Sequence, residues 1–145
     1  MNYNASGSKC YKDSTTYCEK YGKLYNWEMA KMACPQSWHL PSNVEWDILT
    51  KVLGGEETAG KYLKAVSGWK ENGNGEDQFG FSALPSGYGS SDGSFGNFGN
   101  YGSWWSTSEF NSDHAYYQYM GYGNEFAGYR ISIKNLLYSV RCLQD

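Results

Sequence analysis

Between Lys70 and Arg130 the chain has no lysine or arginine, yet fifteen aromatic residues lie from Phe79 to Tyr129. Glycine recurs through the same stretch, which also holds seven acidic residues without a basic neighbour among them. Disordered segments are poor in aromatic residues, because they cannot bury enough apolar surface to offset the entropy lost on ordering. We therefore expect a folded, glycine-rich and negatively charged segment, whose chemistry suits neutral polyhydroxy ligands or partner proteins better than nucleic acids.

The length and charge of the chain indicate a single domain over residues 1–145. A chain of 145 residues can bury a core of ordinary size. Its net charge of −3 lacks the basic excess of a nucleic-acid-binding protein. No apolar run reaches the about 18 residues of a membrane span, and the N-terminus lacks the features of a signal peptide. We expect a mature or excised domain that belongs to a larger exported protein.

Four cysteines indicate the compartment: Cys10, Cys18, Cys34 and Cys142. None has the C-x-x-C spacing of a metal site, and two histidines are few for zinc. Disulfides are therefore favoured, and with them an extracellular or bacterial cell-surface location. Three pairings are possible, of which we favour a local Cys10–Cys18 bond and a Cys34–Cys142 bond between an early helix and the last strand. The alternative is four buried thiols in a cytosolic protein.

The first half of the chain carries the start and stop signals of helices. Asn26 is a candidate N-cap for a helix that Pro35 ends. Ser42 and Glu45 form the pattern of a capping box, and the helix that they open ends near Gly54. Its predicted core-facing stripe consists of Val44, Ile48, Leu49, Val52 and Leu53. Residues 58–66 are expected to form another short helix or an irregular turn.

Helical periodicity ends at Lys70, and glycine, serine and asparagine then separate short apolar pieces up to residue 101. This pattern predicts long loops held by inserted aromatic side chains. Alternating residues predict strands at 103–108, 114–119, 129–133 and 138–143. Helices followed by loops and antiparallel strands define an α+β fold with segregated elements.

Five strings in order resemble one family: CPQSWHLPS at 34–42, EW at 45–46, GFSALPSGY at 80–88, WSTSE at 105–109 and SVRC at 139–142. The family is the Fibrobacter succinogenes major paralogous domain of bacterial exported and surface proteins. The lead-in from Asn2 and Tyr3 to Trp27 also fits, so the resemblance spans essentially the whole chain.

That family is similar in turn to the C-type lectin-like fold. The resemblance implies two N-terminal helices, a long loop region, a small twisted antiparallel sheet, and terminal segments fastened by Cys34 and Cys142. The Glu-Pro-Asn, Gln-Pro-Asp and Trp-Asn-Asp strings of calcium-dependent lectins do not occur, so calcium-bridged sugar binding is not carried over. We expect no cofactor and no metal; calcium at Glu76, Asp77 and Asp92 is the alternative, although Asp92 precedes glycine as turn formers do.

The tryptophans divide into core and surface candidates. Trp105 matches a family string and is expected in the core, as are Trp27, Trp38 and Trp46. Because neighbouring strand residues point to opposite faces, Trp104 is expected to face a ligand, with burial beneath a loop as the alternative.

The strand at 114–119 carries tyrosine on both faces. A half-buried strand needs only one apolar face, so part of this tyrosine set should be exposed, where tyrosine favours recognition. The predicted ligand-binding residues are the aromatic Trp104, Tyr116, Tyr117, Tyr119, Tyr122 and Tyr129, with polar partners Asn111, Asp113, Gln118 and Asn124. The alternative is that the tyrosines are structural and pack against glycine-rich loops.

No catalytic motif is found. His39 lies in a family string and is expected to be structural, and His114 has no nucleophile motif around it. A carboxylate pair for glycoside hydrolysis stays open, since its separation is invisible in a sequence. We predict a non-catalytic extracellular module that binds glycan, with plant cell-wall polysaccharide suggested by the family's association with fibre-degrading bacteria. The alternative is a protein-binding or adhesion module that uses the same sheet face; a shallow aromatic groove would favour glycan, and a broad flat patch would favour protein.

Overall fold

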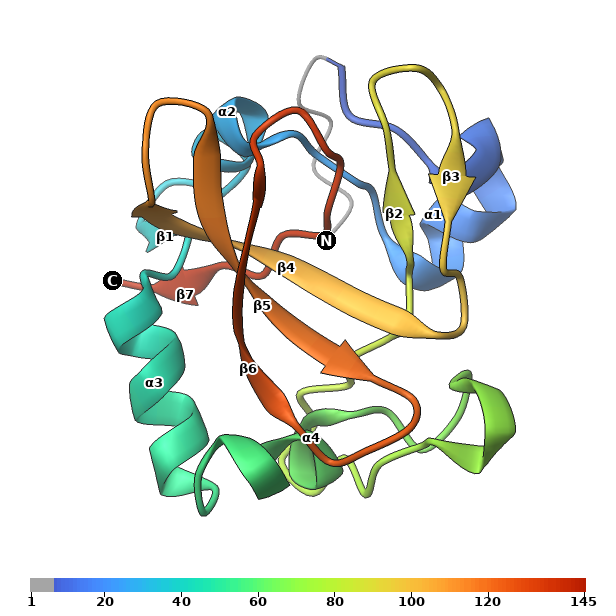
Figure 1. The fold of residues 1–145 in the computed structure, drawn as a ribbon, viewed down its shortest axis with the longest axis vertical. Coiled ribbons are helices and arrows are strands. Elements are labelled where there is room, and N and C mark those ends of the chain that lie inside the picture. The colour runs from blue at the N-terminus through green and yellow to red at the C-terminus, as the bar shows by residue number, and fades with distance from the viewer. Residues whose placement is uncertain (1–6) are drawn as a thin grey trace.

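Helices precede the main sheet in the computed structural model, which describes residues 7–145 (Figure 1). The helical elements are η1 (Tyr11–Asp13), α1 (Thr15–Tyr21), α2 (Trp27–Ala30), α3 (Asn43–Val52), α4 (Glu56–Leu63) and η2 (Lys70–Asn72). The strands are β1 (Trp38–His39), β2 (Tyr88–Gly89), β3 (Phe95–Gly96), β4 (Tyr101–Glu109), β5 (His114–Gly121), β6 (Ala127–Ile133) and β7 (Leu143–Gln144). This order confirms a mixed helix and sheet fold with small antiparallel sheets; Asn2 and Tyr3 lie outside the described residues.

Side-chain caps start the two predicted helices. The Asn26 side chain accepts a hydrogen bond from the Met29 amide at 2.9 Å. At α3, the Ser42 side chain accepts from the Glu45 amide, and the Glu45 carboxylate accepts from the Ser42 amide at 2.8 Å, which confirms the capping box. The helix α2 ends at Ala30, earlier than predicted, and α1 was not anticipated.

The main sheet has the antiparallel order β4-β5-β6. Residues opposite each other share a face, so the pairs Trp105↔Tyr117 and Tyr117↔Arg130 define what we call the first face. The predicted strand 138–143 is wrong, because the strand observed in this region, β7, begins only at Leu143 and pairs with β1. The segment around Ser139 instead lies beside β4, where the Trp105 amide donates to the Ser139 carbonyl at 3.1 Å.

Around Trp105 the first face is sealed by a core of residues from both ends of the chain, whereas Arg130 on the outer strand of this face is exposed. Trp105 is completely buried, and its indole N–H donates to the Tyr25 carbonyl at 2.7 Å. The other buried members are Tyr25, Trp27, Ala30, Ala33, Leu40, Ala115, Tyr138, Val140 and Cys142. The predicted core positions of Trp27, Trp46 and Trp105 are confirmed, whereas Trp38 is 41% exposed on the short strand β1.

A second core lies between the opposite face, here called the second face, and the helices α3 and α4 (Figure 1). Trp104 is only 4% exposed and packs there, so its predicted ligand-facing position is wrong. Alternation does place Trp104 and Trp105 on opposite faces, but both faces are covered at this point. Gln118, opposite Trp104, is 1% exposed for the same reason, which also contradicts its predicted role as a polar partner for a ligand.

The predicted core stripe of α3 is mostly on the wrong side. Trp46, Thr50 and Leu53 face the sheet, whereas Val44, Ile48 and Val52 are exposed. The large indole of Trp46 fills the space above Trp104 and Phe81, and this turns the β-branched side chains outward. The helix α4 approaches β6 closely at Gly60, whose amide donates to the Glu125 carbonyl at 2.7 Å.

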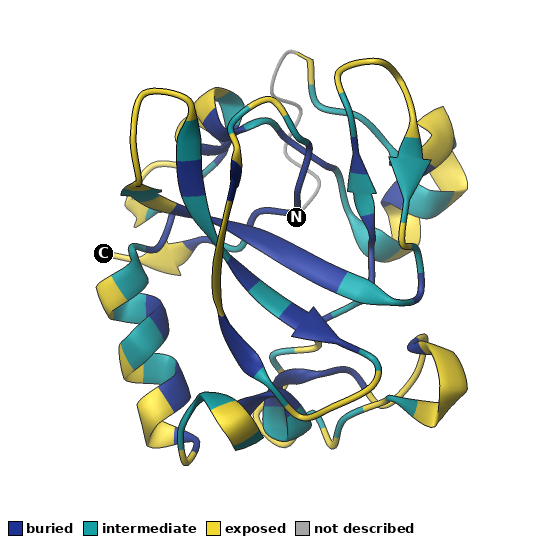
Figure 2. Cartoon of the chain, viewed as in Figure 1, coloured by how far each residue is buried: buried dark blue, intermediate teal, exposed yellow. Residues whose placement is uncertain are grey.

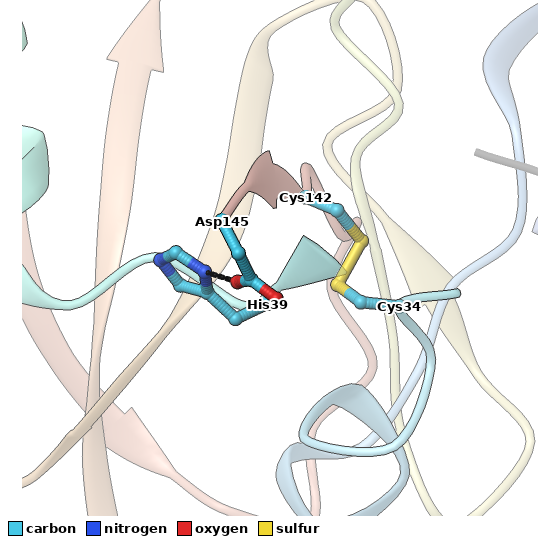
Figure 3. The surroundings of a disulfide bond; sticks show 4 residues. All are labelled: Cys34, His39, Cys142 and Asp145. Carbon is cyan, nitrogen blue, oxygen red and sulfur yellow. Dashed lines mark hydrogen bonds and ion pairs between the residues drawn. A yellow bond between two sulfur atoms is a disulfide. The ribbon is translucent and has the colours of Figure 1, made fainter. Parts of the chain in front are cut away.

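Two disulfides join Cys10 to Cys18 and Cys34 to Cys142, as predicted. The second bond spans 108 residues of sequence and lies beside the β1–β7 pair. Figure 3 shows the same region, where His39 of β1 meets Asp145 next to the bond between Cys34 and Cys142. The early part of the chain is therefore tied to its last residues by covalent, backbone and side-chain contacts.

Candidate binding surface

One end of the second face is not covered by α3 or α4 and presents apolar side chains to solvent. The exposed fractions are 52% for Phe110, 41% for Tyr129, 44% for Ile131 and 47% for Ile133, and Tyr116 is half-buried between them. Register explains the grouping, because Tyr116 lies opposite Ile131 and His114 lies opposite Ile133. We call Phe110, Tyr116, Tyr129, Ile131 and Ile133 the open sheet face; Figure 2 shows the contrast between largely exposed β6 and largely buried β4.

The three aromatic rings of the open sheet face pack edge to face. The ring centroids of Phe110 and Tyr116 are 5.7 Å apart with planes at 88°, and those of Tyr116 and Tyr129 are 5.6 Å apart at 89°. These are favourable geometries for aromatic pairs. The rings therefore hold one another in place, and they do not form a coplanar platform.

The strand β6 is the outer strand of this sheet, since the only strand paired with it in the described chain is β5. The Lys134 amide donates to the Asp113 carbonyl at 3.0 Å, so these two residues form a hydrogen-bonded pair of the antiparallel ladder. Hydrogen-bonded and non-hydrogen-bonded pairs alternate along such a ladder. The pair of Tyr116 and Ile131 is then a non-hydrogen-bonded one, and the backbone N–H and C=O of Ile131 point away from β5. The open sheet face thus combines apolar side chains with outward backbone groups.

The turn between β4 and β5 borders the open sheet face with polar groups. The Asn111 side-chain oxygen accepts from the amides of Asp113 and His114, both at 2.9 Å. Lys134 donates to the Glu109 carboxylate, and this contact holds the pKa of Glu109 below its usual value. The turn is therefore fixed by its own Asn111 and by Lys134 from beyond β6, and Asp113 within the turn is exposed.

The structure brings together only part of the predicted site. Tyr116 and Tyr129 lie on the open sheet face, and Tyr116 contacts Phe110, which precedes the turn that carries Asn111 and Asp113. Tyr117 and Tyr119 belong to the first face, so the predicted residues do not share one face.

Tyr117 and Tyr119 have structural contacts on the first face. The Tyr117 ring packs against Tyr138 at 4.6 Å between centroids. Tyr119 lies 5.3 Å from the Tyr101 ring, and burial raises the pKa of Tyr119 to about 12. These two residues fit the alternative of packed tyrosines better than a shared ligand surface.

Tyr122 and Asn124 lie at the far end of β5, in the turn that leads to β6. The buried Lys64 holds this turn, donating to the carbonyls of Gly121 at 3.2 Å and Asn124 at 2.8 Å. Burial lowers the pKa of Lys64, and Tyr122 packs against the second core. This end of the sheet is a stabilised turn, separate from the open sheet face.

Three residues of the open sheet face were missed from the sequence: Phe110, Ile131 and Ile133. The alternation of Ile131 and Ile133 with Arg130 and Ser132 predicted the strand correctly. It carried no information on which face a helix would leave open. That depends on how α3 and α4 are placed over the sheet.

The three acids of the calcium alternative each have local contacts. Glu76 lies 3.3 Å from Lys61, Asp77 accepts from the Ser82 amide at 2.6 Å, and Asp92 accepts from the Ser94 amide at 2.9 Å. Within residues 7–145, no group of three or more His, Cys, Asp or Glu side chains is arranged to hold a metal ion. The contact of Asp92 is the turn contact expected from its sequence; calcium binding stays an untested alternative.

His39 lies between two carboxylates. Its Nδ1 is 2.6 Å from Asp145 and its Nε2 is 2.7 Å from Glu45, and these hydrogen bonds raise the pKa of His39. The Ser42 hydroxyl donates to Glu45, so an acid lies between this hydroxyl and the imidazole. The arrangement fastens β1 to α3 and to Asp145.

Fold and surface together define a disulfide-bonded α+β domain with one open, partly aromatic sheet face. The family model of the Fibrobacter succinogenes major domain matches residues 1–144, and the chain belongs to this family. No curated protein and no solved structure gave a match. Across the described residues, no helix has the length and apolar character needed to cross a membrane.

Proposed function

We propose that this domain is a non-catalytic extracellular binding module that contacts a protein ligand through the open sheet face. The observation that carries the proposal is the group of exposed apolar side chains on β5 and β6, including Tyr129, Ile131 and Ile133. Contiguous exposed apolar surface is typical of interaction sites. The two disulfides are compatible with an exported location.

Three features favour a protein ligand over a sugar. Branched aliphatic side chains contribute two of the five residues, and sugars stack on aromatic ring faces. The rings of Phe110, Tyr116 and Tyr129 stand edge to face, so few ring faces are turned toward solvent together. The outward backbone groups at Ile131 also suit pairing with an extended segment of a partner.

Glycan binding is the second candidate, and the position of Tyr129 favours it. Its ring is 41% exposed and packs against Tyr116, which in turn contacts Phe110 at the start of the polar turn. A sugar chain that extends from Tyr129 past Tyr116 would reach the amide and carboxylate groups of that turn. The proposed architecture is C-type lectin-like, which the β1–β7 pair and the Cys34–Cys142 bond support by fastening the two ends of the chain.

A selection with phage-displayed peptides tests the protein-binding proposal. Peptides are selected on the wild-type domain and compared on Ile131→Arg, with exposed Val52→Arg on α3 as the matched control. We expect peptides that lose at least about tenfold in affinity on Ile131→Arg and bind the control as the wild type. Enrichment of peptides indifferent to Ile131→Arg, or of none, would contradict the proposal.

Affinity electrophoresis on polysaccharides, with and without EDTA, tests the glycan candidate. Retardation that survives EDTA and is lost in Tyr129→Ala would show that the open sheet face binds a glycan, and would contradict the assignment of a protein ligand. Retardation lost with EDTA would instead support the calcium alternative.

A further inference from the structure

An apolar groove runs along α3, and none of its lining residues belongs to the open sheet face. It consists of two adjoining cavities of about 280 and about 440 Å³, which share Leu49, Phe81 and Arg141 in their walls. Trp46 and Leu143 line the first cavity. These volumes are comparable to the lower part of the range for small-molecule sites, about 300–1,000 Å³.

Arg141 places a positive charge in these apolar walls. Its guanidinium carbon lies 4.4 Å from the centre of the Phe81 ring, and its Nη2 donates to the Phe81 carbonyl at 2.7 Å. Among residues 7–145, Arg141 takes part in none of the ion pairs. Burial lowers the pKa of Arg141, with the charge of Asp77 opposing this, but a guanidinium stays protonated in proteins.

The remaining donors of Arg141 are available to a ligand. Within the described chain, no nitrogen of Arg141 is both buried and without a hydrogen bond. The nitrogens that do not bond Phe81 therefore keep some exposed surface; Arg141 lines both cavities of the groove, and also a more polar cavity with Glu19, Ser82 and Ser139. A charge in apolar surroundings without an ionic partner is costly, so an anion bound there relieves that cost.

The acid in the groove does not occupy Arg141. Glu45 lines the first cavity, but its Oε1 meets His39 and its Oε2 accepts from the Ser42 amide and hydroxyl. Among residues 7–145, Arg141 thus has no carboxylate in direct contact, only the more distant charge of Asp77, and apolar walls lie on either side of it.

We propose that this groove binds a small amphiphilic carboxylate, with an alkyl or aryl part between Leu49 and Phe81 and the carboxylate on Arg141. The guanidinium fork is suited to two parallel hydrogen bonds with a carboxylate. Four of the five strings quoted above meet here, through Pro41, Trp46, Phe81 and Arg141. They come from three separate regions of the sequence, and the sheet-face function does not use them.

A head-group series on the wild-type domain tests the proposal by ¹H–¹⁵N NMR titration. Sodium octanoate, octylammonium chloride and 1-octanol share the same tail and differ in charge. We expect octanoate to shift resonances of Leu49, Phe81 and Arg141 and to bind at least about tenfold tighter than octylammonium, since only the carboxylate accepts charge-assisted hydrogen bonds from Arg141. Equal affinity for both ions, shifts confined to the open sheet face, or no shift below the micelle concentration would overturn it.

Substitution of the cation gives a second test. Arg141→Gln is expected to weaken octanoate binding at least about tenfold and to leave 1-octanol binding unchanged, whereas the exposed Lys51→Gln on α3 leaves both unchanged. Unaltered octanoate binding by a folded Arg141→Gln would overturn the assignment of the carboxylate to Arg141. Where Arg141→Gln does not fold, the head-group series on the wild type decides alone.

Discussion

The two faces of the main sheet differ in how completely they are covered. The first face is sealed around Trp105 by residues from both ends of the chain, and the Cys34–Cys142 bond closes that core. The second face is sealed at Trp104 by α3 and α4 and is open at Ile131. The strand β5 therefore contributes buried residues such as Met120 to the interior and Tyr116 to the candidate binding surface.

This difference shows that alternation along a strand predicts direction but not exposure. Trp104 and Trp105 point to opposite faces as expected, yet both are buried. On the second face, Gln118 is buried and the adjacent Tyr129 is 41% exposed. These two residues lie opposite each other, so what separates them is the strand: Gln118 is on the central β5, and Tyr129 is on the outer β6.

Removing the Cys34–Cys142 bond has the largest expected effect, because that bond closes the sealed first face. Loss of a cross-link that spans 108 residues removes about 4–5 kcal/mol from the free energy of unfolding in the chain-entropy model. Urea denaturation of Cys34→Ala/Cys142→Ala against the wild type measures it.

The control is Cys10→Ala/Cys18→Ala, whose cross-link spans 8 residues. The same chain-entropy model gives about 2–3 kcal/mol for this short loop. Equal losses from both pairs would show that strain or packing, and not the length of the closed loop, sets their contributions.

Within the second face, a matched pair of truncations compares the covered end with the open end. Met120 is fully buried against the helices, and Ile131 is 44% exposed on the neighbouring strand. Met120→Ala is expected to cost about 2–5 kcal/mol, because it leaves a cavity. Ile131→Ala is expected to stay within about 0.5 kcal/mol of the wild type, and thermal denaturation of both compares them. A comparable loss in Ile131→Ala would mean that the open end is covered in solution.

Much of the fold was predictable because its signals are local. The Asn26 cap, the Ser42 capping box and the strands β4, β5 and β6 depend on residues a few positions apart. Disulfide pairing followed from spacing, with support from the family resemblance. The two-residue strand β7 could not be predicted, since it forms only by pairing with β1, more than a hundred residues away.

The candidate surface was predicted less well because exposure is a tertiary property. The tyrosine-rich strand identified the correct region, and Tyr116 and Tyr129 lie on the open sheet face. Helices cover Trp104 and Gln118, and the sequence pattern of α3 predicted the wrong core-facing side for that helix. Trp46 faces the sheet, whereas the predicted Val44 and Ile48 are exposed. Residues close together in sequence do not indicate which part of the sheet the helices leave uncovered.

The smallest expected effect is a pH dependence at His39, at the rim of the sealed core. Hydrogen bonds to Asp145 and Glu45 raise the pKa of His39 from its ordinary 6.5, so the stability it contributes is full below that value. It is lost as pH rises through the folded-state pKa. The hydrogen bond from the Ser42 amide is the main cause that lowers the pKa of Glu45, whose contribution is instead lost in acid.

Thermal midpoints of wild type and His39→Gln between pH 5 and pH 9 measure this contribution. The advantage of the wild type should be greatest near the acid end and shrink toward pH 9, because only the imidazolium can donate to both carboxylates. Asp145→Asn, which removes one of the two acceptors, should show a weaker pH dependence than the wild type. The groups are exposed, so solvent screening keeps the effect small. Midpoint curves of wild type and His39→Gln that run parallel across this range would show that the bridge does not contribute to holding the C-terminal residue against β1.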